Sequence, residues 1–214
     1  VLAPQSCRFL CRPFASIANK MKWNFKKEKE EYLYHFTNSD AAIIKILPSE
    51  KLRLNDLTLT NDPREYKSFG FGGINGNFDE SNYLEEFIVA QESISKRLKD
   101  NCKVLCFCED YYIDNEWWDG FNLPRMWYQY GENHKGVCLQ IDKNTFIEEN
   151  KDLINRDLTF FKEIEYTNRN NYPFINFKKI EDDGDGYLKR FIEANHRYLY
   201  FQKNRDWETE HEVR

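Results

Sequence analysis

Long apolar runs are missing from this sequence of 214 residues. No hydrophobic stretch approaches the ~18 to 20 consecutive apolar residues that a membrane-spanning helix requires. Residues 1–20 also lack the continuous apolar core that precedes the cleavage site of a secretory signal. These absences predict a cytoplasmic protein with no membrane partner.

An excess of positive charge is also absent. The chain carries 31 Lys and Arg residues against 36 Asp and Glu residues, which gives a formal net charge of −5 at pH 7. A protein of this charge has no global positive field that would gather nucleic acid or anionic lipid. We therefore expect no non-specific nucleic-acid binding, and any contact with nucleic acid has to be local.

Cysteine pairs of the C-x2-C type, which mark many zinc sites, do not occur among the six cysteines. Cys102, Cys106 and Cys108 lie close in sequence, but their spacing does not match known ligand sets. The cysteines after residue 20 lie in apolar stretches, where a thiol behaves as a small buried hydrophobe. We predict reduced thiols and no bound zinc, and stoichiometric zinc in the purified protein would contradict this.

Aromatic residues are abundant. The 17 Phe, 13 Tyr and 5 Trp residues make up 16% of the chain, so the core should be rich in rings. A length of 214 residues suits one domain with a real hydrophobic core. Residues 1–20 differ in composition from the rest of the chain, and we expect a non-native or disordered leader there. Residues 21–214 are predicted to form a single domain, because no linker or repeat divides them.

Hydrophobic periodicity predicts both strands and helices. Alternating or short apolar segments predict strands over residues 32–37, 51–54, 103–108, 137–141, 160–166 and 207–214. Helical spacing predicts helices over residues 41–47, 83–99, 126–130 and 187–202. The first helix is expected to begin at the capping residues Asn38, Ser39 and Asp40 and to end at Pro48. Strands and helices alternate only loosely, which favours an α+β fold.

Turns and loops are predicted between these segments. Asn61-Asp62-Pro63 has turn chemistry. The glycine-rich segment 69–77 is predicted to be a mobile loop. It is not predicted to bind phosphate, because it contains no phosphate-binding glycine motif. Residues 109–121 and the acidic segment 181–186 are also predicted to be loops. The last segment resembles a strand cut off midway, so the domain is expected to continue beyond Arg214.

Three groups of residues together resemble the bacterial family known as domain of unknown function 2971 (DUF2971). The first group is Tyr34-His35-Phe36-Thr37, Ile46-Leu47, Leu52-Arg53-Leu54 and Asn61-Asp62-Pro63-x-Glu65. The second is Cys106-Phe107-Cys108 with Met126-Trp127-x-x-Tyr130-x-x-x-His134-x-Gly136-Val137-x-Leu139, and the third is Lys203 with Trp207-x-x-Glu210-x-Glu212-x-Arg214. The resemblance covers nearly everything after Met21, although many members carry Ser where this chain has Cys108. It supplies no activity but implies a phage-defence or toxin setting.

The order of several residues also resembles ADP-ribosyltransferases, whose first strand often carries His-x-Thr and whose late strand carries a catalytic Glu. His35-x-Thr37 stands in the first predicted strand here, and Glu210-x-Glu212 stands in the last. The resemblance implies a mixed, mostly antiparallel split sheet flanked by helices, with NAD as the substrate. It further implies that His35 and Thr37 hold the nicotinamide end of NAD. A glutamate, with Glu212 favoured over Glu210, would stabilise an oxocarbenium-like transition state.

Further residues complete the predicted NAD site. The proposed cofactor-binding residues are His35, Thr37, Asn61, Asp62, Trp127, Tyr130 and His134. Several have a plainer structural interpretation. His35 can be a hydrogen-bonded structural residue at a strand end, and Asn61-Asp62-Pro63 can serve only as a turn. Trp127 and Tyr130 lie three positions apart on one helical face, so core packing is an equal alternative to stacking on a ligand.

The late glutamates also have two interpretations. Strand alternation predicts that Glu208, Glu210 and Glu212 point to one face of the strand, where two of them can serve one cleft. The alternative is plain ion pairing with three basic residues nearby, Lys203, Arg205 and Arg214. Only the first interpretation places a reactive carboxylate in a cleft.

Three functions remain open on sequence alone. The first is an NAD-using ADP-ribosyltransferase or NAD glycohydrolase that acts on a protein, a nucleic acid or NAD itself. The second is a non-enzymatic domain that recognises a nucleotide or a peptide through aromatic residues. The third is a metal-dependent nuclease or hydrolase that uses acidic residues of one loop, namely Glu109, Asp110, Asp114 and Asp119.

The transferase hypothesis makes a structural prediction. His35, Thr37 and one of Glu210 and Glu212 should converge on one pocket, because a split sheet can place the first strand near the last. An experimental structure of the protein with NAD checks this. Separations far beyond side-chain reach would remove the transferase hypothesis.

Overall fold

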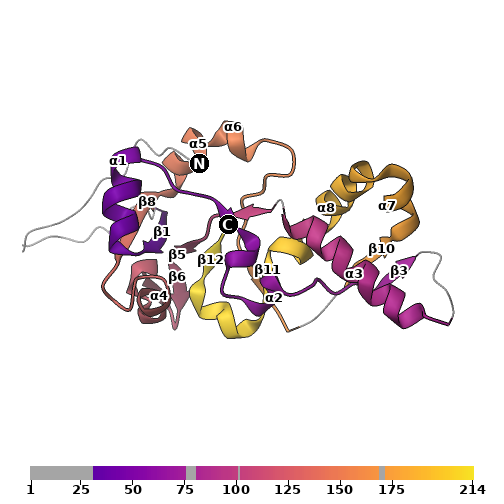
Figure 1. Cartoon of the computed structure of the whole chain (residues 1–214). Coiled ribbons are helices and arrows are strands. Elements are labelled where there is room, and N and C mark those ends of the chain that lie inside the picture. The colour runs from indigo at the N-terminus through magenta and orange to yellow at the C-terminus, as the bar shows by residue number, and fades with distance from the viewer. Residues whose placement is uncertain (1–30, 76–80, 101, 169–171) are drawn as a thin grey trace, which may run out of the picture. The chain divides into compact units, whose positions relative to one another are not determined.

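Figure 1 shows the fold of the chain as a computed structural model, which describes residues 31–75, 81–100, 102–168 and 172–214. The described residues form two compact units. Unit 1 comprises Leu52–Cys106 and Asp152–Arg214, and unit 2 comprises residues up to 51 with Phe107–Lys151. The predicted leader lies outside the described residues. Among the helices that are described, none is long and apolar enough to cross a membrane.

Three antiparallel strands lie at the centre of unit 2. They are β5 (Phe107–Glu109), β1 (Tyr32–Thr37) and β8 (Val137–Asp142), with β1 between the other two. β1 pairs with β8 along its whole length and with β5 where Tyr34 lies opposite Cys108. Tyr34 and Phe36 point to one face of β1, because they are two residues apart. That face carries a buried cluster with Cys108, Leu123 and Met126, and the strands predicted at 32–37 and 137–141 are confirmed.

The helix after β1 begins as predicted but ends later. The side chain of Asn38 accepts a hydrogen bond from the backbone N–H of Ala41 at 2.7 Å, which satisfies one donor left open at the helix start. A π-helix, η1 (Ala41–Ile46), then continues into α1 (Leu47–Ser49). Pro48 does not end the helix, because it lies at the start of α1, where its missing N–H costs little. Glu50, with a left-handed φ of 52°, follows the last helical residue.

Residues 109–121, predicted to be a loop, contain a β-hairpin. Its strands are β6 (Tyr111–Ile113) and β7 (Glu116–Trp118). The two turn residues, Asp114 and Asn115, have φ values of 52° and 64°. Positive φ at both central residues is typical of the turn whose twist matches that of antiparallel strands, and Asp and Asn tolerate it well. The loop prediction is therefore wrong, and the two-residue Asp-Asn turn is the reason.

The remainder of unit 2 connects the hairpin to β8 and continues beyond β8. Its elements are η3 (Gly120–Asn122), α4 (Pro124–Gln129) and α5 (Lys143–Glu149). The helical turn predicted near residues 126–130 is confirmed by α4. A tight connection from Gly131 to Gly136 leads into β8, and its chain crosses close to β1. A side chain at Gly136 would meet the backbone oxygen of Thr37 at 2.3 Å, so only glycine fits there.

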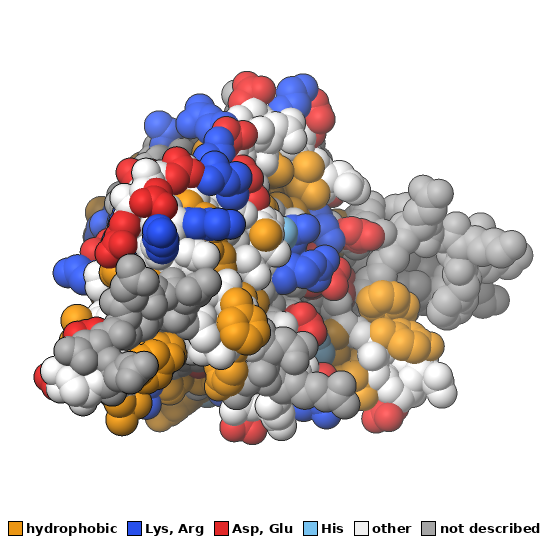
Figure 2. Space-filling view, turned by 90° about the vertical axis from the view of Figure 1, so that its right-hand side faces the viewer, with side chains coloured by type: hydrophobic (Ala, Val, Ile, Leu, Met, Phe, Trp, Pro, Cys, Tyr) orange, Lys and Arg blue, Asp and Glu red, His pale blue; other side chains and the backbone are white. Residues whose placement is uncertain are grey.

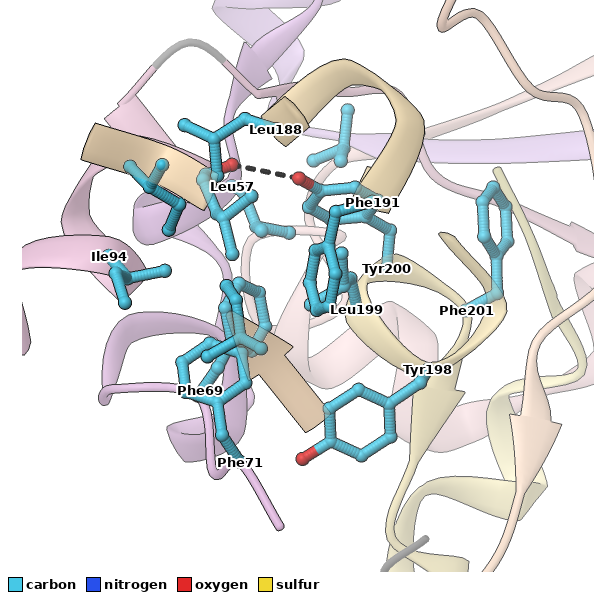
Figure 3. Close-up of a cluster of buried hydrophobic side chains, with 14 of the residues drawn as sticks. Leu57, Phe69, Phe71, Ile94, Leu188, Phe191, Tyr198, Leu199, Tyr200 and Phe201 are labelled. Carbon is cyan, nitrogen blue, oxygen red and sulfur yellow. Dashed lines mark hydrogen bonds between the residues drawn. The ribbon is translucent and has the colours of Figure 1, made fainter. Parts of the chain in front are cut away.

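Two long helices dominate unit 1 and both were predicted. They are α3 (Tyr83–Asp100) and α8 (Asp185–Tyr200). Figure 3 shows their buried side chains within a cluster that is rich in aromatic rings. The rings of Phe71 and Phe191 meet edge to face at 6.2 Å, and the hydroxyl of Tyr200 donates to the carbonyl of Leu98 at 2.9 Å. The helices thus share one core, with a buried polar atom satisfied inside it.

Short strands and helices complete unit 1. An antiparallel pair joins β2 (Asn55–Asp56) to β4 (Lys103–Val104), and parallel pairs join β3 (Gly73–Asn75) to β10 (Phe174–Asn176) and β9 (Glu165–Tyr166) to β11 (Gln202–Lys203). The remaining elements are η2 (Leu57–Leu59), α2 (Pro63–Tyr66), α6 (Lys151–Ile154), α7 (Phe177–Asp183), η4 (Arg205–Glu210) and β12 (Glu212–Val213). The antiparallel pairings and the mixture of helices and strands agree with the predicted α+β class.

Several predicted boundaries in unit 1 are wrong. The strand expected at 51–54 lies at 55–56, the one expected at 160–166 is reduced to 165–166, and residues 103–108 form two strands with a break between them. Part of the glycine-rich segment forms β3, which pairs with β10. The acidic segment 181–186 is helical except at Gly184, because a φ of 49° there separates α7 from α8. The boundaries of these short segments depend on pairing with distant parts of the chain, and the periodicity of the sequence does not record that pairing.

Exposed charges of both signs lie on the face drawn in Figure 2, where Lys and Arg side chains alternate with Asp and Glu side chains. Exposed ion pairs join Lys189 to Asp157 at 2.6 Å and Arg97 to Asp185 at 3.1 Å. Pairs of this kind contribute little to stability, because water screens them. The cores, rather than these surface pairs, therefore hold the units together.

The core of unit 1 offers a matched test of burial. Leu57 is fully buried, whereas Leu59 in the same turn of helix is 73% exposed. Leu57→Ala should lower the free energy of unfolding by about 2 to 5 kcal/mol, because it removes buried methyl groups and leaves a cavity. Leu59→Ala should change it by less than about 0.5 kcal/mol. Urea denaturation measures both, and equal effects of the two changes would contradict the assigned packing.

Candidate functional site

Five charged side chains are buried together in unit 1, and we call them the charge cluster. They are Glu65, Lys203, Glu210, Glu212 and Arg214. None has an exposed fraction above 7%, and that of Glu210 is 1%. Charged side chains are seldom buried to this degree unless they are paired. Burial here therefore demands a specific electrostatic arrangement.

The last turn of the chain brings two of the three glutamates of the cluster, Glu210 and Glu212, to the same place. η4 ends at Glu210, His211 has a left-handed φ of 44°, and β12 then begins at Glu212. The strand predicted over residues 207–214 is thus reduced to β12, because η4 takes up its first part. The predicted common face is wrong, because Glu208 is exposed while Glu210 and Glu212 are buried. The change of direction at His211 lets carboxylates from a helical turn and from a strand reach one cation.

Lys203 is that cation. Its Nζ lies 2.9 Å from Oε2 of Glu210 and 2.5 Å from Oε2 of Glu212. On the other side of Glu212, Nε of Arg214 lies 2.5 Å from Oε1, and Arg214 also forms an ion pair with Glu65. Each cation thus lies between two carboxylates. The ion pairing proposed as an alternative for Lys203 and Arg214 is confirmed, although this does not exclude a chemical role for the glutamates.

Backbone hydrogen bonds fix the strand that carries Glu212 and Arg214. The backbone N–H of Arg214 donates to the carbonyl of Lys162 at 2.9 Å, and that of Ile164 donates to the carbonyl of Glu212 at 2.9 Å. The backbone N–H of Glu212 donates to the hydroxyl of Tyr166 at 2.8 Å. The carboxylate of Glu212 is therefore positioned by its backbone as well as by its two cations.

The charge state of Glu212 follows from its neighbours. Burial by itself raises the pKa of a carboxyl group, because it disfavours the charged form. Arg214 and Lys203 oppose burial and lower the pKa of Glu212 from 4.5 to about 2. Glu212 in turn helps to raise the pKa of Lys203 above its ordinary value, against the effect of burial. Both groups are thus charged at neutral pH, as the chemistry of a fixed anion requires.

A thiol lies against the same carboxylate. Cys106 and Glu212 share a side-chain hydrogen bond, in which the thiol is the donor and the carboxylate the acceptor. Burial, followed by the nearby charge of Glu212, raises the pKa of Cys106 well above its ordinary value. A thiol in this state is a poor nucleophile, because the thiolate is the reactive form. Cys106 therefore holds Glu212 in place rather than attacking a substrate.

The predicted turn at Asn61-Asp62-Pro63 brings Glu65 into the cluster. The backbone N–H of Glu65 donates to the carbonyl of Asp62 at 2.9 Å, which starts α2 directly after the turn. Asp62 is 3% exposed, whereas Asn61 is exposed. Lys99 donates from Nζ to the backbone carbonyl of Glu65 at 2.7 Å. The turn thus positions a cluster residue, and of the two predicted ligand-binding residues Asn61 is the one open to solvent.

The other predicted site residues lie in unit 2, and the structure describes their surroundings there. The ring of His35 meets that of Phe107 edge to face at 5.9 Å. Trp127 packs on Phe36 at 5.2 Å, and its Nε1 donates to the carbonyl of Phe121 at 2.7 Å. Tyr130 also packs against the buried cluster of unit 2. The core-packing interpretation of Trp127 and Tyr130 is thus confirmed.

His134 and Thr37 lie near the start of β8. His134 is exposed, has a φ of 68°, and its ring lies 6.1 Å from that of Tyr128. Thr37 ends β1 opposite Val137. Because His35 and Thr37 belong to unit 2 whereas Glu210 and Glu212 belong to unit 1, their convergence on one pocket stays a prediction.

Two of the four acidic residues of the metal-hydrolase hypothesis, Glu109 and Asp110, have other partners. Glu109 lies 2.6 Å from Nζ of Lys143, and Asp110 accepts a hydrogen bond from the backbone N–H of Gly120 at 3.0 Å. In the part of the chain that the structure describes, no group of three or more His, Cys, Asp or Glu residues is arranged to hold a metal ion. The described cysteines, Cys102, Cys106, Cys108 and Cys138, are all free thiols.

Two members of the site were missed by sequence reasoning. Both residues, Glu65 and Cys106, stand in motifs that resemble DUF2971, and Cys106 is also weighed as a zinc ligand, but the sequence assigns neither to a site with Glu212. No local signal joins them to the end of the chain, because they lie more than a hundred residues before Glu212. A Glu shortly after an Asp-Pro turn does indicate a helix start, but it does not indicate an ion pair.

Comparison with known proteins finds one family model that matches part of the chain. A family model described as "Protein of unknown function (DUF2971)" matches residues 126–214. The match supports the DUF2971 resemblance over these residues, which include Lys203, Glu210, Glu212 and Arg214. No curated protein and no solved structure matches the chain. The comparison thus supports a resemblance to DUF2971 over part of the chain and supplies no activity.

The depressed pKa of Glu212 predicts how the charge cluster responds to acid. A carboxylate with a pKa of about 2 in the folded state and about 4.5 when unfolded stabilises the protein above pH 4.5. This contribution is lost as the pH falls from 4.5 towards 2. Glu212→Gln should therefore lower the free energy of unfolding at pH 7, and its difference from wild type should shrink over that range.

Urea denaturation at pH 7, 5, 4 and 3 measures this difference. Glu208→Gln is the matched control, because it removes an exposed carboxylate only four residues away. The control should follow the wild-type pH dependence. A difference between Glu212→Gln and wild type that does not change with pH would show that Glu212 is not held ionised by the cluster.

Proposed function

We propose that this chain is an enzyme that cleaves the bond between nicotinamide and ribose in NAD, as an ADP-ribosyltransferase or an NAD glycohydrolase. One observation carries the proposal: a buried glutamate, Glu212, is held ionised between Lys203 and Arg214, with its pKa lowered to about 2. A second glutamate, Glu210, lies on the same lysine. A pair of carboxylates in a low-dielectric setting suits a reaction that develops positive charge.

The reaction gives the carboxylate a defined task. Nicotinamide leaves with the electron pair of the glycosidic bond, and the ribose carbon that loses it becomes electron-poor, as in an oxocarbenium ion. A negative charge fixed beside the ribose lowers the energy of this state. A hydroxyl group of the acceptor, or water, then attacks the same carbon and releases its proton to solvent. The carboxylate has to be ionised before nicotinamide leaves, and Glu212 meets this requirement at neutral pH.

The cations have a positioning role in this proposal. Arg214 and Lys203 each hold one oxygen of Glu212, so the carboxylate cannot rotate away as charge develops. Groups that are already oriented do not have to reorganise during the reaction, and this is a main source of electrostatic catalysis. Lys203 also lies 5.2 Å from the ring centre of Trp207, which further restricts its movement.

The substrate-binding part of the proposal rests on residues that the resemblance to ADP-ribosyltransferases and the exposure of polar side chains indicate. His35 and Thr37 are proposed to hold the nicotinamide end of NAD, and Asn61 and His134 are accessible polar residues that can contact the rest of the nucleotide. The acceptor is a protein, a nucleic acid or water. A phage-defence or toxin setting fits such an activity, because depletion of NAD or modification of a host component stops cell growth.

A purely structural role for the charge cluster is the competing explanation. Buried ion pairs are often no more stabilising than apolar residues of the same volume, because desolvation offsets their attraction. Stability alone is therefore a weak explanation for five paired charges in a protein interior. Ionisable residues with strongly shifted pKa values are often found at functional sites, where burial and neighbouring charges set the protonation state that the chemistry needs.

The proposal predicts separate effects of two substitutions in the full-length protein. Glu212→Gln should abolish the release of nicotinamide while leaving NAD binding largely intact, because the amide keeps the size but not the charge of the carboxylate. His35→Ala should instead weaken NAD binding, because its proposed task is to hold the substrate. Chromatographic detection of nicotinamide and calorimetric titration with NAD measure the two quantities.

Glu208→Gln serves as the control and should release nicotinamide at the wild-type rate. Wild-type release by Glu212→Gln would move the catalytic role to Glu210, which Glu210→Gln then tests. Circular dichroism at the assay temperature shows whether each variant is folded, so that a loss of turnover is not confused with unfolding. If the wild-type protein does not bind NAD, the proposal fails.

A further inference from the structure

The β6–β7 hairpin of unit 2 carries aromatic rings on a face that is open to solvent. Tyr112 lies opposite Trp117 in the register of the two strands, and their ring centres are 5.2 Å apart. Tyr112 is 55% exposed and Trp117 is 61% exposed. Residues directly opposite each other in antiparallel strands share a face. The two rings therefore form one platform, which we call the ring pair.

The opposite face of the hairpin has a different role. Tyr111 and Trp118 lie opposite each other in the register, one position away from the ring pair, so they point the other way. Tyr111 packs against the buried cluster of unit 2. The face with Tyr111 anchors the hairpin, and the ring pair is left outside the core of its own unit.

The hairpin is held in a defined conformation. Asp110, just before β6, accepts hydrogen bonds from the backbone N–H of Gly120, at 3.0 Å, and from the hydroxyl of Tyr34. Asp114 and Asn115 form a tight turn with two positive φ angles. These contacts fix both ends of the hairpin, and an exposed surface that is already ordered loses little entropy on binding.

The charged side chains of the segment that forms the hairpin have one sign. Between Glu109 and Leu123 the sequence contains five carboxylates and no Lys or Arg. Three of the five, Asp114, Glu116 and Asp119, are exposed. Glu116 lies opposite Ile113, one position from the ring pair, and so points to the other face of the hairpin. Cations are attracted both to carboxylates and to the faces of Trp and Tyr rings. Nucleic-acid phosphates and anionic lipids are repelled by the same carboxylates. The chemistry of the surface thus selects for a positively charged ligand.

We propose that the ring pair and its neighbouring carboxylates bind a segment of a partner protein that is rich in Arg or Lys. The guanidinium groups of Arg stack on aromatic rings and pair with carboxylates at the same time, so they fit this surface well. The proposal concerns unit 2 alone and does not rest on the proposed reaction with NAD. The cleavage of NAD and the binding of a basic segment can therefore be tested separately, and failure of one proposal does not affect the other.

The test uses a fluorescein-labelled peptide of alternating arginine and glycine, with fluorescence anisotropy as the readout on the full-length protein. Tyr112→Ala combined with Trp117→Ala should weaken binding about tenfold, since each exposed cation–π contact contributes roughly 0.5 to 1 kcal/mol. Asp114→Asn combined with Asp119→Asn should also weaken binding and reduce its salt dependence. A peptide of alternating serine and glycine should not bind.

Matched variants outside the hairpin separate this surface from non-specific attraction. Tyr83→Ala removes a ring of unit 1 that is 50% exposed, and Glu181→Gln combined with Asp182→Asn removes two exposed carboxylates of α7. Both should bind the arginine peptide as the wild type does. The proposal is overturned if these controls weaken binding as much as the hairpin variants, or if the Tyr112/Trp117 variant binds normally. Tighter binding of a labelled single-stranded DNA at the ring pair would also overturn it.

Discussion

The pairing of Lys203 with two buried glutamates is the interaction on which the end of unit 1 depends. Carboxylates from η4 and from β12 meet on one Nζ atom, and this is possible only because His211 turns the chain with a left-handed φ of 44°. Arg214 completes the arrangement by joining Glu212 to Glu65. Removal of any one partner would leave an uncompensated buried charge, at a cost of about 3 to 5 kcal/mol.

The same arrangement gives the chain a carboxylate that stays ionised while almost removed from water. Burial and neighbouring cations act on the pKa of Glu212 in opposite directions, and the cations dominate. A charge held in this way interacts strongly with any positive charge that develops beside it, because little water remains to screen it. The burial that makes these charges costly to remove from water is thus also what the proposed reaction would use.

The two units present different chemistry to their surroundings. Unit 1 encloses its distinctive charges, whereas unit 2 displays a pair of aromatic rings with carboxylates near them. The residues matched by the DUF2971 family model include parts of both units, from α4 to the last residue of the cluster, but they exclude the β6–β7 hairpin and Glu65. The matched residues supply Lys203, Arg214 and two of the three glutamates of the cluster, Glu210 and Glu212.

Sequence alone determined the long and strongly periodic elements. Apolar spacing located α3 and α8, and alternation located β1 and β8, because in these segments local pattern and burial agree. The capping role of Asn38 also followed from residue type and order. Tertiary structure decided the rest: the two-residue Asp114-Asn115 turn made a hairpin where a loop was predicted, and the left-handed His211 made a helical turn where a strand was predicted. It also decided that Glu65 and Cys106 join Glu212, since contacts between residues so far apart along the chain depend on packing that no local pattern records.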